Sequence, residues 1–151
     1  MIVTVGLCTR DEFLILDEYP SEDHKYIAID GYSSYGGSAT NIALILSQLG
    51  PKVSLITSIG KNSTQKQNEI LESFSQKKLI THGISSIDDE IFKTVILINS
   101  QNSSRTAIAI EGARLEELNQ QQRTLLDKAS IIYLDGSNRV PIDQEIFNIA
   151  K

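Results

Sequence analysis

The chain has 151 residues, of which 40% are hydrophobic and 22% are charged, and its formal net charge is −5. These values are typical of one soluble globular domain. No run of Lys or Arg is long enough to follow a phosphate backbone, which argues against a nucleic-acid partner. No apolar run approaches the length of a membrane-spanning helix, so we expect no membrane association.

Cysteine and histidine are scarce in this sequence. Cys8 is the only cysteine and cannot form an internal disulfide, and His24 and His82 show no zinc-ligand spacing with it. We assign none of the three a functional role. The N-terminus lacks the basic segment and the apolar stretch of a signal peptide. These features predict a protein of the reducing cytoplasm.

The first residues predict a strand followed by a hairpin. Ile2 to Val5 is a β-branched run that ends at Gly6, which is typical of a buried strand. Phe13 to Leu16 and Tyr26 to Tyr32 are short alternating runs bounded by turn residues, and we expect them to form an antiparallel pair. This hairpin is interpreted as an appendage to the main sheet.

From Ala39 the spacing of the hydrophobic residues changes to that of a helix. This helix is predicted to end at Gly50-Pro51. Its buried face is predicted from the spacing i, i+3, i+4 and i+7 of Ile42, Ile45, Leu46 and Leu49. Val53 to Thr57 follows as a predicted strand. Gln67 to Lys78 is predicted as an amphipathic helix that buries Ile70, Leu71 and Phe74.

In the second half, Thr94 to Ile98 and Thr106 to Ile110 are predicted strands that pair across a polar turn. The remaining predicted elements are a helix from Leu115 to Leu126, a strand from Ile131 to Leu134, and a last helix that begins at Pro141 and buries Ile142, Ile146 and Phe147. Strands that alternate with helices predict an α/β fold with a largely parallel sheet. Because the chain stops after a strand and a helix, we expect an incomplete domain.

The segment from Gly31 to Asn41 is rich in glycine and hydroxyl groups and leads directly into the first predicted helix. Gly36 and Gly37 let the backbone approach a ligand closely, and the first helical turn offers free N–H groups. The amide of Asn41 can donate to and accept from a sugar hydroxyl. The Lys of a phosphate-binding Walker motif is absent. Two interpretations remain open from the residues alone, a polyol-binding loop and a tight turn with a helix cap.

The spacing of this loop carries a family resemblance. The run from Gly36 to Ala43, followed at fixed intervals by Gly50 and Gly60, resembles the N-terminal signature of PfkB/ribokinase-type carbohydrate kinases. Ser104-Arg105-Thr106 is similar to another segment of that family. The stretch from Leu134 to Asn138 most resembles the ketohexokinases and fructokinases within it.

The resemblance implies a ribokinase-like fold, in which Rossmann-like layers around a parallel sheet carry a small β lid. The lid strands would lie at about 13–17 and 26–34. In this family the lid covers the substrate and often mediates dimerisation, which implies a homodimer. Family members are longer, so residues 1–151 would be the N-terminal part of the kinase domain. The C-terminal half, with the Gly-Ala-Gly-Asp segment of the catalytic base and the ATP site, would be absent.

The resemblance also implies a sugar-binding site. Its residues would be Asp11, Gly36, Gly37, Ser38 and Asn41. An ionised carboxylate such as that of Asp11 can accept hydrogen bonds from two hydroxyl groups at once. For Arg105 two roles stay open, a contact to phosphate oxygens and a solvated turn.

The implied activity is ATP-dependent phosphorylation of a sugar hydroxyl by the full-length protein. ATP and Mg²⁺ are the expected cofactors, and neither would be bound by this segment alone. The segment from Lys61 to Lys66 departs from the family, which usually has an acidic residue and then a glycine there. This departure favours an alternative, a noncatalytic kinase-like remnant that acts as a sugar-binding or dimerisation module. A plain Rossmann-like nucleotide-binding module rests on the α/β pattern alone.

Overall fold

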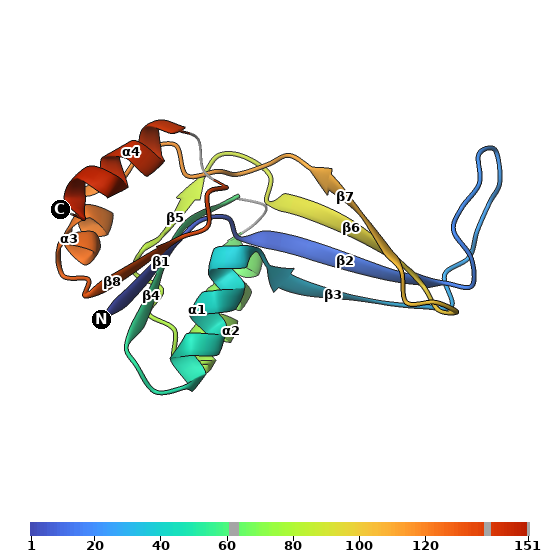
Figure 1. Cartoon of the computed structure of the whole chain (residues 1–151), viewed down its shortest axis with the longest axis horizontal. Helices are drawn as coiled ribbons and strands as arrows, with labels where there is room; N and C mark the ends of the chain where they lie inside the picture. The colour runs from blue at the N-terminus through green and yellow to red at the C-terminus, as the bar shows by residue number, and fades with distance from the viewer. Residues whose placement is uncertain (61–63, 138–139, 151) are drawn as a thin grey trace.

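A four-stranded parallel sheet forms the core of the computed structural model, which describes residues 1–60, 64–137 and 140–150 (Figure 1). Its strands, in spatial order, are β5 (Ile84–Ile87), β4 (Val53–Gly60), β1 (Ile2–Val5) and β8 (Ile131–Leu134). All three pairings are parallel. The predicted α/β architecture is therefore confirmed. β5 was not predicted, because two serines interrupt its apolar pattern.

Helices cover both faces of this sheet (Figure 1). On one side lie α1 (Ser38–Gln48) and α2 (Thr64–Gln76), and on the other lie α3 (Gln120–Asp127) and α4 (Val140–Ile149). Alternate residues of β4 serve the two sides: Leu55 packs in the cluster with Phe74 of α2, whereas Ile56 packs in the cluster with Leu126 of α3. Every residue of β4 is buried, as expected for a strand that is covered on both faces, including its three hydroxyl residues Ser54, Thr57 and Ser58.

Helix α1 is present as predicted, but the prediction of its buried face is wrong. Ile45 is 56% exposed and Leu49 is 73% exposed. The residues that face the sheet are instead mostly small, namely Ala39, Thr40, Ala43, Leu44 and Ser47. Small side chains allow the helix backbone to lie close to β1 and β4, and this close approach outweighs the burial of the larger residues. In α4 the prediction for Phe147 is also wrong, because that ring is 57% exposed.

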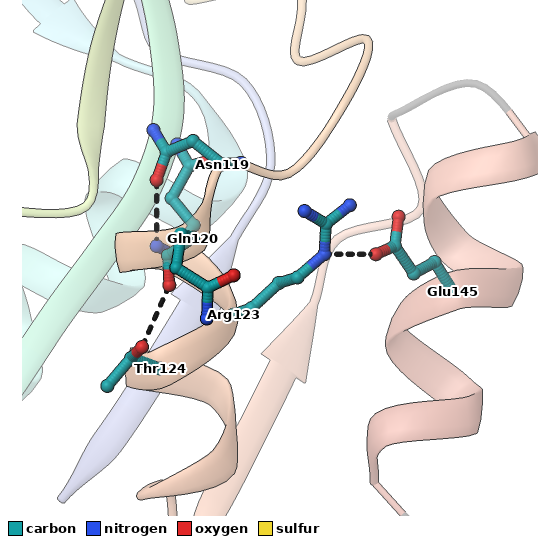
Figure 2. A network of polar contacts seen from close by, with 6 residues as sticks. Asn119, Gln120, Arg123, Thr124 and Glu145 are labelled. Carbon is teal, nitrogen blue, oxygen red and sulfur yellow. Dashed lines mark hydrogen bonds and ion pairs between the residues drawn. The ribbon is translucent and has the colours of Figure 1, made fainter.

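Helix α3 begins five residues later than predicted because a capping box sets its start (Figure 2). The Asn119 side chain accepts from the backbone N–H of Gln122 at 2.9 Å, and the Gln122 side chain accepts from the backbone N–H of Asn119 at 2.9 Å. Arg123 then reaches across to α4, where its Nε lies 2.8 Å from Oε1 of Glu145 (Figure 2). The preceding segment buries Leu115 and Leu118 without being helical.

A second four-stranded sheet extends away from the core and is called the lid sheet here (Figure 1). Its spatial order is β3 (Asp30–Gly36), β2 (Thr9–Leu16), β6 (Phe92–Asn99) and β7 (Arg105–Ile110). Both predicted antiparallel pairs are confirmed. The parallel pairing of β2 with β6, which joins the two pairs into one sheet, was not predicted.

The second lid strand lies further along the chain than predicted. Residues 26 to 29 belong to the long β2–β3 connection, and Ile27 is 83% exposed there. The strand itself contains Gly31, Ser33 and Ser34, which carry little β propensity. Its register, from Thr9 opposite Gly36 to Ile15 opposite Asp30, is set by pairing along β2 rather than by its own sequence.

Within the described ranges, no helix is long and apolar enough to cross a membrane.

Cys8 lies fully buried where the chain passes from β1 to β2. Burial raises the pKa of the Cys8 thiol to about 12, while a hydrogen bond with Thr40 lowers it in part and the Asp11 charge raises it further. The thiol is therefore a neutral core group at physiological pH.

We predict that alkaline pH destabilises the fold through Cys8. The folded chain retains the thiol proton above its usual pKa of 9.0, whereas the unfolded chain releases it, so stability is lost as the pH rises from 9 toward 12. The expected loss is about 1 kcal/mol for each pH unit in that window. Urea unfolding of the wild type and Cys8→Ala at neutral and alkaline pH measures it. An equally steep alkaline loss in Cys8→Ala would show that other groups cause it.

Candidate functional site

The candidate site lies where the ends of β1 and β8 meet the start of α1. Asp135 follows β8 directly, and Leu7 follows β1. Oδ2 of Asp135 accepts from the backbone N–H of Leu7 at 3.3 Å and from the backbone N–H of Ala39 at 3.2 Å. Oδ1 accepts from the backbone N–H of Ser137 at 2.8 Å and also from the Ser137 hydroxyl. One carboxylate therefore joins three segments of the chain.

Asp135 takes the part of an N-cap for α1. The N-cap residue, Gly37, has no side chain to accept from the first helical turn, and Asp135 accepts from Ala39 in its place. A negative charge at a helix N-terminus is stabilised by the helix dipole. The free N–H groups expected at this helix start are thus partly satisfied within the protein.

Two glycines make this convergence sterically feasible. A Cβ on Gly6 would overlap the carboxylate of Asp135. A Cβ on Gly37 would overlap the carbonyl oxygen of Leu7, and Gly37 has φ 98°, a conformation that side chains disfavour. The Thr40 hydroxyl donates to the same Leu7 carbonyl at 3.0 Å. Glycine at position 37 of the signature therefore has a packing reason.

At the end of β4, Gly60 is also required by close packing against a neighbouring segment. A Cβ on Gly60 would overlap the backbone of residues 89–91, and a Cβ on Gly112 would overlap the backbone of residues 90–92. The segment leading into β6 thus passes between two glycines. The backbone N–H of Ala113 donates to the carbonyl of Glu90 at 2.6 Å and holds it there.

Asp11 lies on β2, well beyond the first strand, because the chain enters a new strand at Thr9. Oδ1 of Asp11 accepts from the Thr9 hydroxyl at 2.8 Å. Its Oδ2 occupies the space beside Gly36, where a Cβ would overlap it. The carboxylate therefore lies against the loop that begins α1.

The face of the lid sheet that carries Asp11 is turned toward Asp135. Thr9 is opposite Phe92 and lies two positions from Asp11, so Phe92 shares that face. The Arg114 guanidinium lies 5.0 Å from the centre of the Phe92 ring and donates through Nη1 to the Ser137 carbonyl at 2.7 Å. The opposite face packs on the core through Tyr35, whose ring meets that of Phe74 edge to face at 6.3 Å.

The structure brings five of the six sequence-predicted residues to one region, and these five are Asp11, Gly36, Gly37, Ser38 and Asn41. Ser38 and Asn41 are exposed in the first turn of α1. Arg105 is not with them. It is exposed at the start of β7 opposite Ile98, and Ile98 lies four positions further along β6 than Thr94, the partner of Asp11.

Sequence reasoning missed Asp135 and Arg114 as site residues. Asp135 had a usable signal, since an acid directly after an apolar parallel strand is placed at the edge of the sheet where sites form. Arg114 carried no comparable signal, because it lies in a connection without regular structure.

A cavity of about 740 Å³ lies beyond the ends of β4 and β5, and neither Asp11 nor Gly37 lines it. Among the described lining residues are four carboxylates and one guanidinium, that of Arg114. This balance of charge disfavours an anionic phosphate. In the part of the chain that the structure describes, no group of His, Cys, Asp and Glu is arranged to hold a metal ion.

Comparison with known proteins defines the class. The family model for pfkB family carbohydrate kinases matches residues 1–151. The chain belongs to this family.

Individual relatives agree with that assignment. The chain is 28% identical over 112 residues to a ribokinase of Dictyostelium discoideum, which is 74% of this chain and 35% of the relative. A ribokinase of Arabidopsis thaliana, solved in complex with ribose and ATP, matches with a TM-score of 0.85 at 17% identity, over 99% of this chain and 50% of its own. A fructokinase of Halothermothrix orenii matches with a TM-score of 0.77 at 21% identity, over 99% and 52%. The fold is thus ribokinase-like, and the chain spans between 35% and 52% of the length of these proteins.

We predict that Gly37→Ala lowers the free energy of unfolding by about 2–4 kcal/mol, because it combines a disfavoured φ with overlap at the Leu7 carbonyl. Gly50→Ala is the matched control, since Gly50 has φ 110° but no atom within 4 Å of an added Cβ. The control should lose only about 1–2 kcal/mol. Chemical unfolding of both variants gives the comparison, and equal losses would contradict the packing argument.

Proposed function

We propose that the full-length protein uses ATP to phosphorylate a sugar hydroxyl, and that this chain supplies the sugar-binding site and the lid. The observation that carries the proposal is the position of the Asp11 carboxylate. It lies beside Gly36, at the entry to α1, on the face of the lid sheet that is turned toward Asp135. Family membership supports the same activity.

Each residue of the site suits a polyol. Asp11 can accept hydrogen bonds from two hydroxyl groups. Gly36 and Gly37 lead into α1, and the side chains of Ser38 and Asn41 are exposed in its first turn. The amide of Asn41 can both donate and accept, which matches a hydroxyl group.

The charge of the site favours a neutral ligand over a nucleotide phosphate. The carboxylate of Asp11 lies beside Gly36, just before α1, and that of Asp135 accepts from Leu7 and from Ala39 in the first turn of α1. A phosphate group at this helix start would be repelled by both charges. The residues described here therefore do not fit ATP. We place ATP and Mg²⁺ on the part of the kinase domain outside residues 1–151, and the proposal does not depend on a phosphate contact from Arg105.

The alternative is a noncatalytic kinase-like remnant that binds sugar or mediates dimerisation. The departure from the family between Lys61 and Lys66 is the observation that favours it, and residues 61–63 of that segment lie outside the described residues. Reading the gene beyond the codon for Lys151 discriminates between the two. A downstream Gly-Ala-Gly-Asp segment supports the kinase, and a stop codon supports the remnant. We place either form in the cytoplasm, with a small sugar as ligand.

We predict that Asp11→Ala and Asn41→Ala each weaken sugar binding by the full-length protein about tenfold or more, because each removes hydrogen bonds to the ligand. Calorimetry with ribose and fructose measures affinity, and ATP-dependent phosphorylation measures activity. Glu12→Ala is the matched control, since Glu12 is the next residue of β2 and points to the other face. Unchanged binding in both test variants would refute the site, and absence of phosphorylation in the wild type would refute the kinase.

We also propose that the lid sheet pairs with a second copy of the chain. Ile108 and Ile110 of the edge strand β7 are each 51% exposed, on the face opposite Asp11. An exposed apolar edge strand is a typical association surface.

We predict that the wild type sediments as a dimer and that Ile108→Lys shifts it to monomer. The exposed Ile45→Lys on α1 serves as control, and a monomeric wild type would contradict the proposal.

A further inference from the structure

The Arg114 side chain joins three segments of the chain that meet at the base of the lid sheet. Its guanidinium carbon lies over the ring of Phe92, the first residue of β6, at 5.0 Å from the ring centre. Its Nη1 donates at 2.7 Å to the carbonyl of Ser137, which follows β8. Its Nη2 lies 3.3 Å from Oε1 of Glu111, in the connection that precedes α3. One side chain therefore contacts both the lid sheet and a segment of the core.

On the lid side, Arg114 contacts the pair of strands that carries Asp11. Phe92 is buried and lies opposite Thr9, and these two residues begin β6 and β2. The Thr9 hydroxyl donates to Oδ1 of Asp11 at 2.8 Å. The position of the Phe92 ring is therefore linked to the position of the Asp11 carboxylate.

On the core side, Arg114 holds the segment that supports the start of α1. The backbone N–H and the hydroxyl of Ser137 both donate to Oδ1 of Asp135. Oδ2 of Asp135 accepts from the backbone N–H of Ala39, in the first turn of α1, at 3.2 Å. A charged donor forms a stronger hydrogen bond than a neutral one, so the contact from Arg114 restrains Ser137 firmly.

The guanidinium is itself well anchored. Ala113 and Leu115, on either side of Arg114 in the sequence, are both buried, and the Arg114 side chain is 20% exposed. Nη1 and Nη2 both have acceptors within the protein. Four carboxylates line the cavity next to this side chain, and their charge disfavours an incoming phosphate. Arg114 is thus suited to holding two parts of the protein together rather than to binding an anion.

We propose that Arg114 is a positioning residue of the proposed sugar site, which holds the lid face that carries Asp11 in place relative to the start of α1. The inference rests on the proposed function, because it takes Asp11 and the first turn of α1 as the groups that bind the sugar. A planar guanidinium can present its face to an aromatic ring while an N–H at its edge donates to a carbonyl. The compact ammonium of lysine does not reproduce this combination.

Steady-state kinetics and calorimetry on the full-length protein, with ribose and fructose, test the inference. Arg114→Met removes the guanidinium, and Arg114→Lys keeps the charge without the planar group. Glu111→Gln removes only an exposed ion pair, since the Glu111 side chain is 77% exposed and such pairs contribute little. Arg123→Met is the matched control, because Arg123 joins α3 to α4 through Glu145 at 2.8 Å, within the core (Figure 2). Chemical unfolding shows whether each variant is folded under the assay conditions.

Arg114→Met and Arg114→Lys should each raise the Kd and the KM for the sugar about tenfold, within the usual range for a residue that acts on a site through its neighbours. The KM for ATP, and kcat at saturating sugar, should stay close to the wild-type values, because we place ATP on the part of the kinase domain outside residues 1–151. Glu111→Gln and Arg123→Met should bind sugar as the wild type does.

Three results would overturn the inference while the proposed function stands. An unchanged sugar Kd in both Arg114 variants, whatever their stability, would mean that the side chain only stabilises the fold. Full recovery in Arg114→Lys would mean that a positive charge alone suffices. Equal increases in the KM for sugar and the KM for ATP would indicate a general disturbance of the enzyme. A wild-type protein that binds neither sugar would refute the proposed function, and the inference with it.

Discussion

The carboxylate of Asp135 is the constraint on which the rest of the site depends. It accepts from Leu7 after β1, from Ala39 in α1 and from Ser137 after β8, so it sets the mutual positions of two strand ends and a helix start. Hydrogen bonds to a charged acceptor are stronger than neutral ones, and these three donors come from separate parts of the chain. The absence of a side chain at Gly6 provides the space. Helix α1 is thereby directed at the site without a cap of its own.

This arrangement supports the proposal that the glycine-rich loop before α1 binds a polyol rather than a phosphate. In many α/β proteins such a helix start binds phosphate through free N–H groups. Here an internal carboxylate accepts from that turn, and the second carboxylate, Asp11, lies beside Gly36. Two negative charges near one helix start favour hydroxyl donors over anions. The same loop sequence would suggest either ligand, and the placement of Asp135 makes the difference.

Much of the core could be predicted from the sequence, because buried parallel strands and amphipathic helices have strong local patterns. β1 and β8 have the predicted bounds, and α1 and β4 begin close to the predicted residues. Features that depend on distant partners could not be predicted. The buried face of α1 follows from close packing by Ala39 and Ala43 rather than from its largest residues. For the candidate site, the signature located Gly36 to Asn41, whereas the role of Asp135 required its three partners to be seen in place.

The lid sheet shows the same dependence on distant contacts at a larger scale. β2 follows β1, and β6 follows β5, yet the two lid strands pair in parallel along their whole length. The segment that precedes each strand packs closely against glycine. Before β2, the Leu7 carbonyl lies against Gly37, and before β6, residues 89–92 pass between Gly60 and Gly112. A side chain at any of these glycines would displace the segment that leads into β2 relative to the segment that leads into β6, and would so disturb the β2–β6 register. The signature glycines Gly37 and Gly60, which are far apart in the sequence, therefore serve one purpose: they fix the two points from which Asp11 and its neighbours are held over the site.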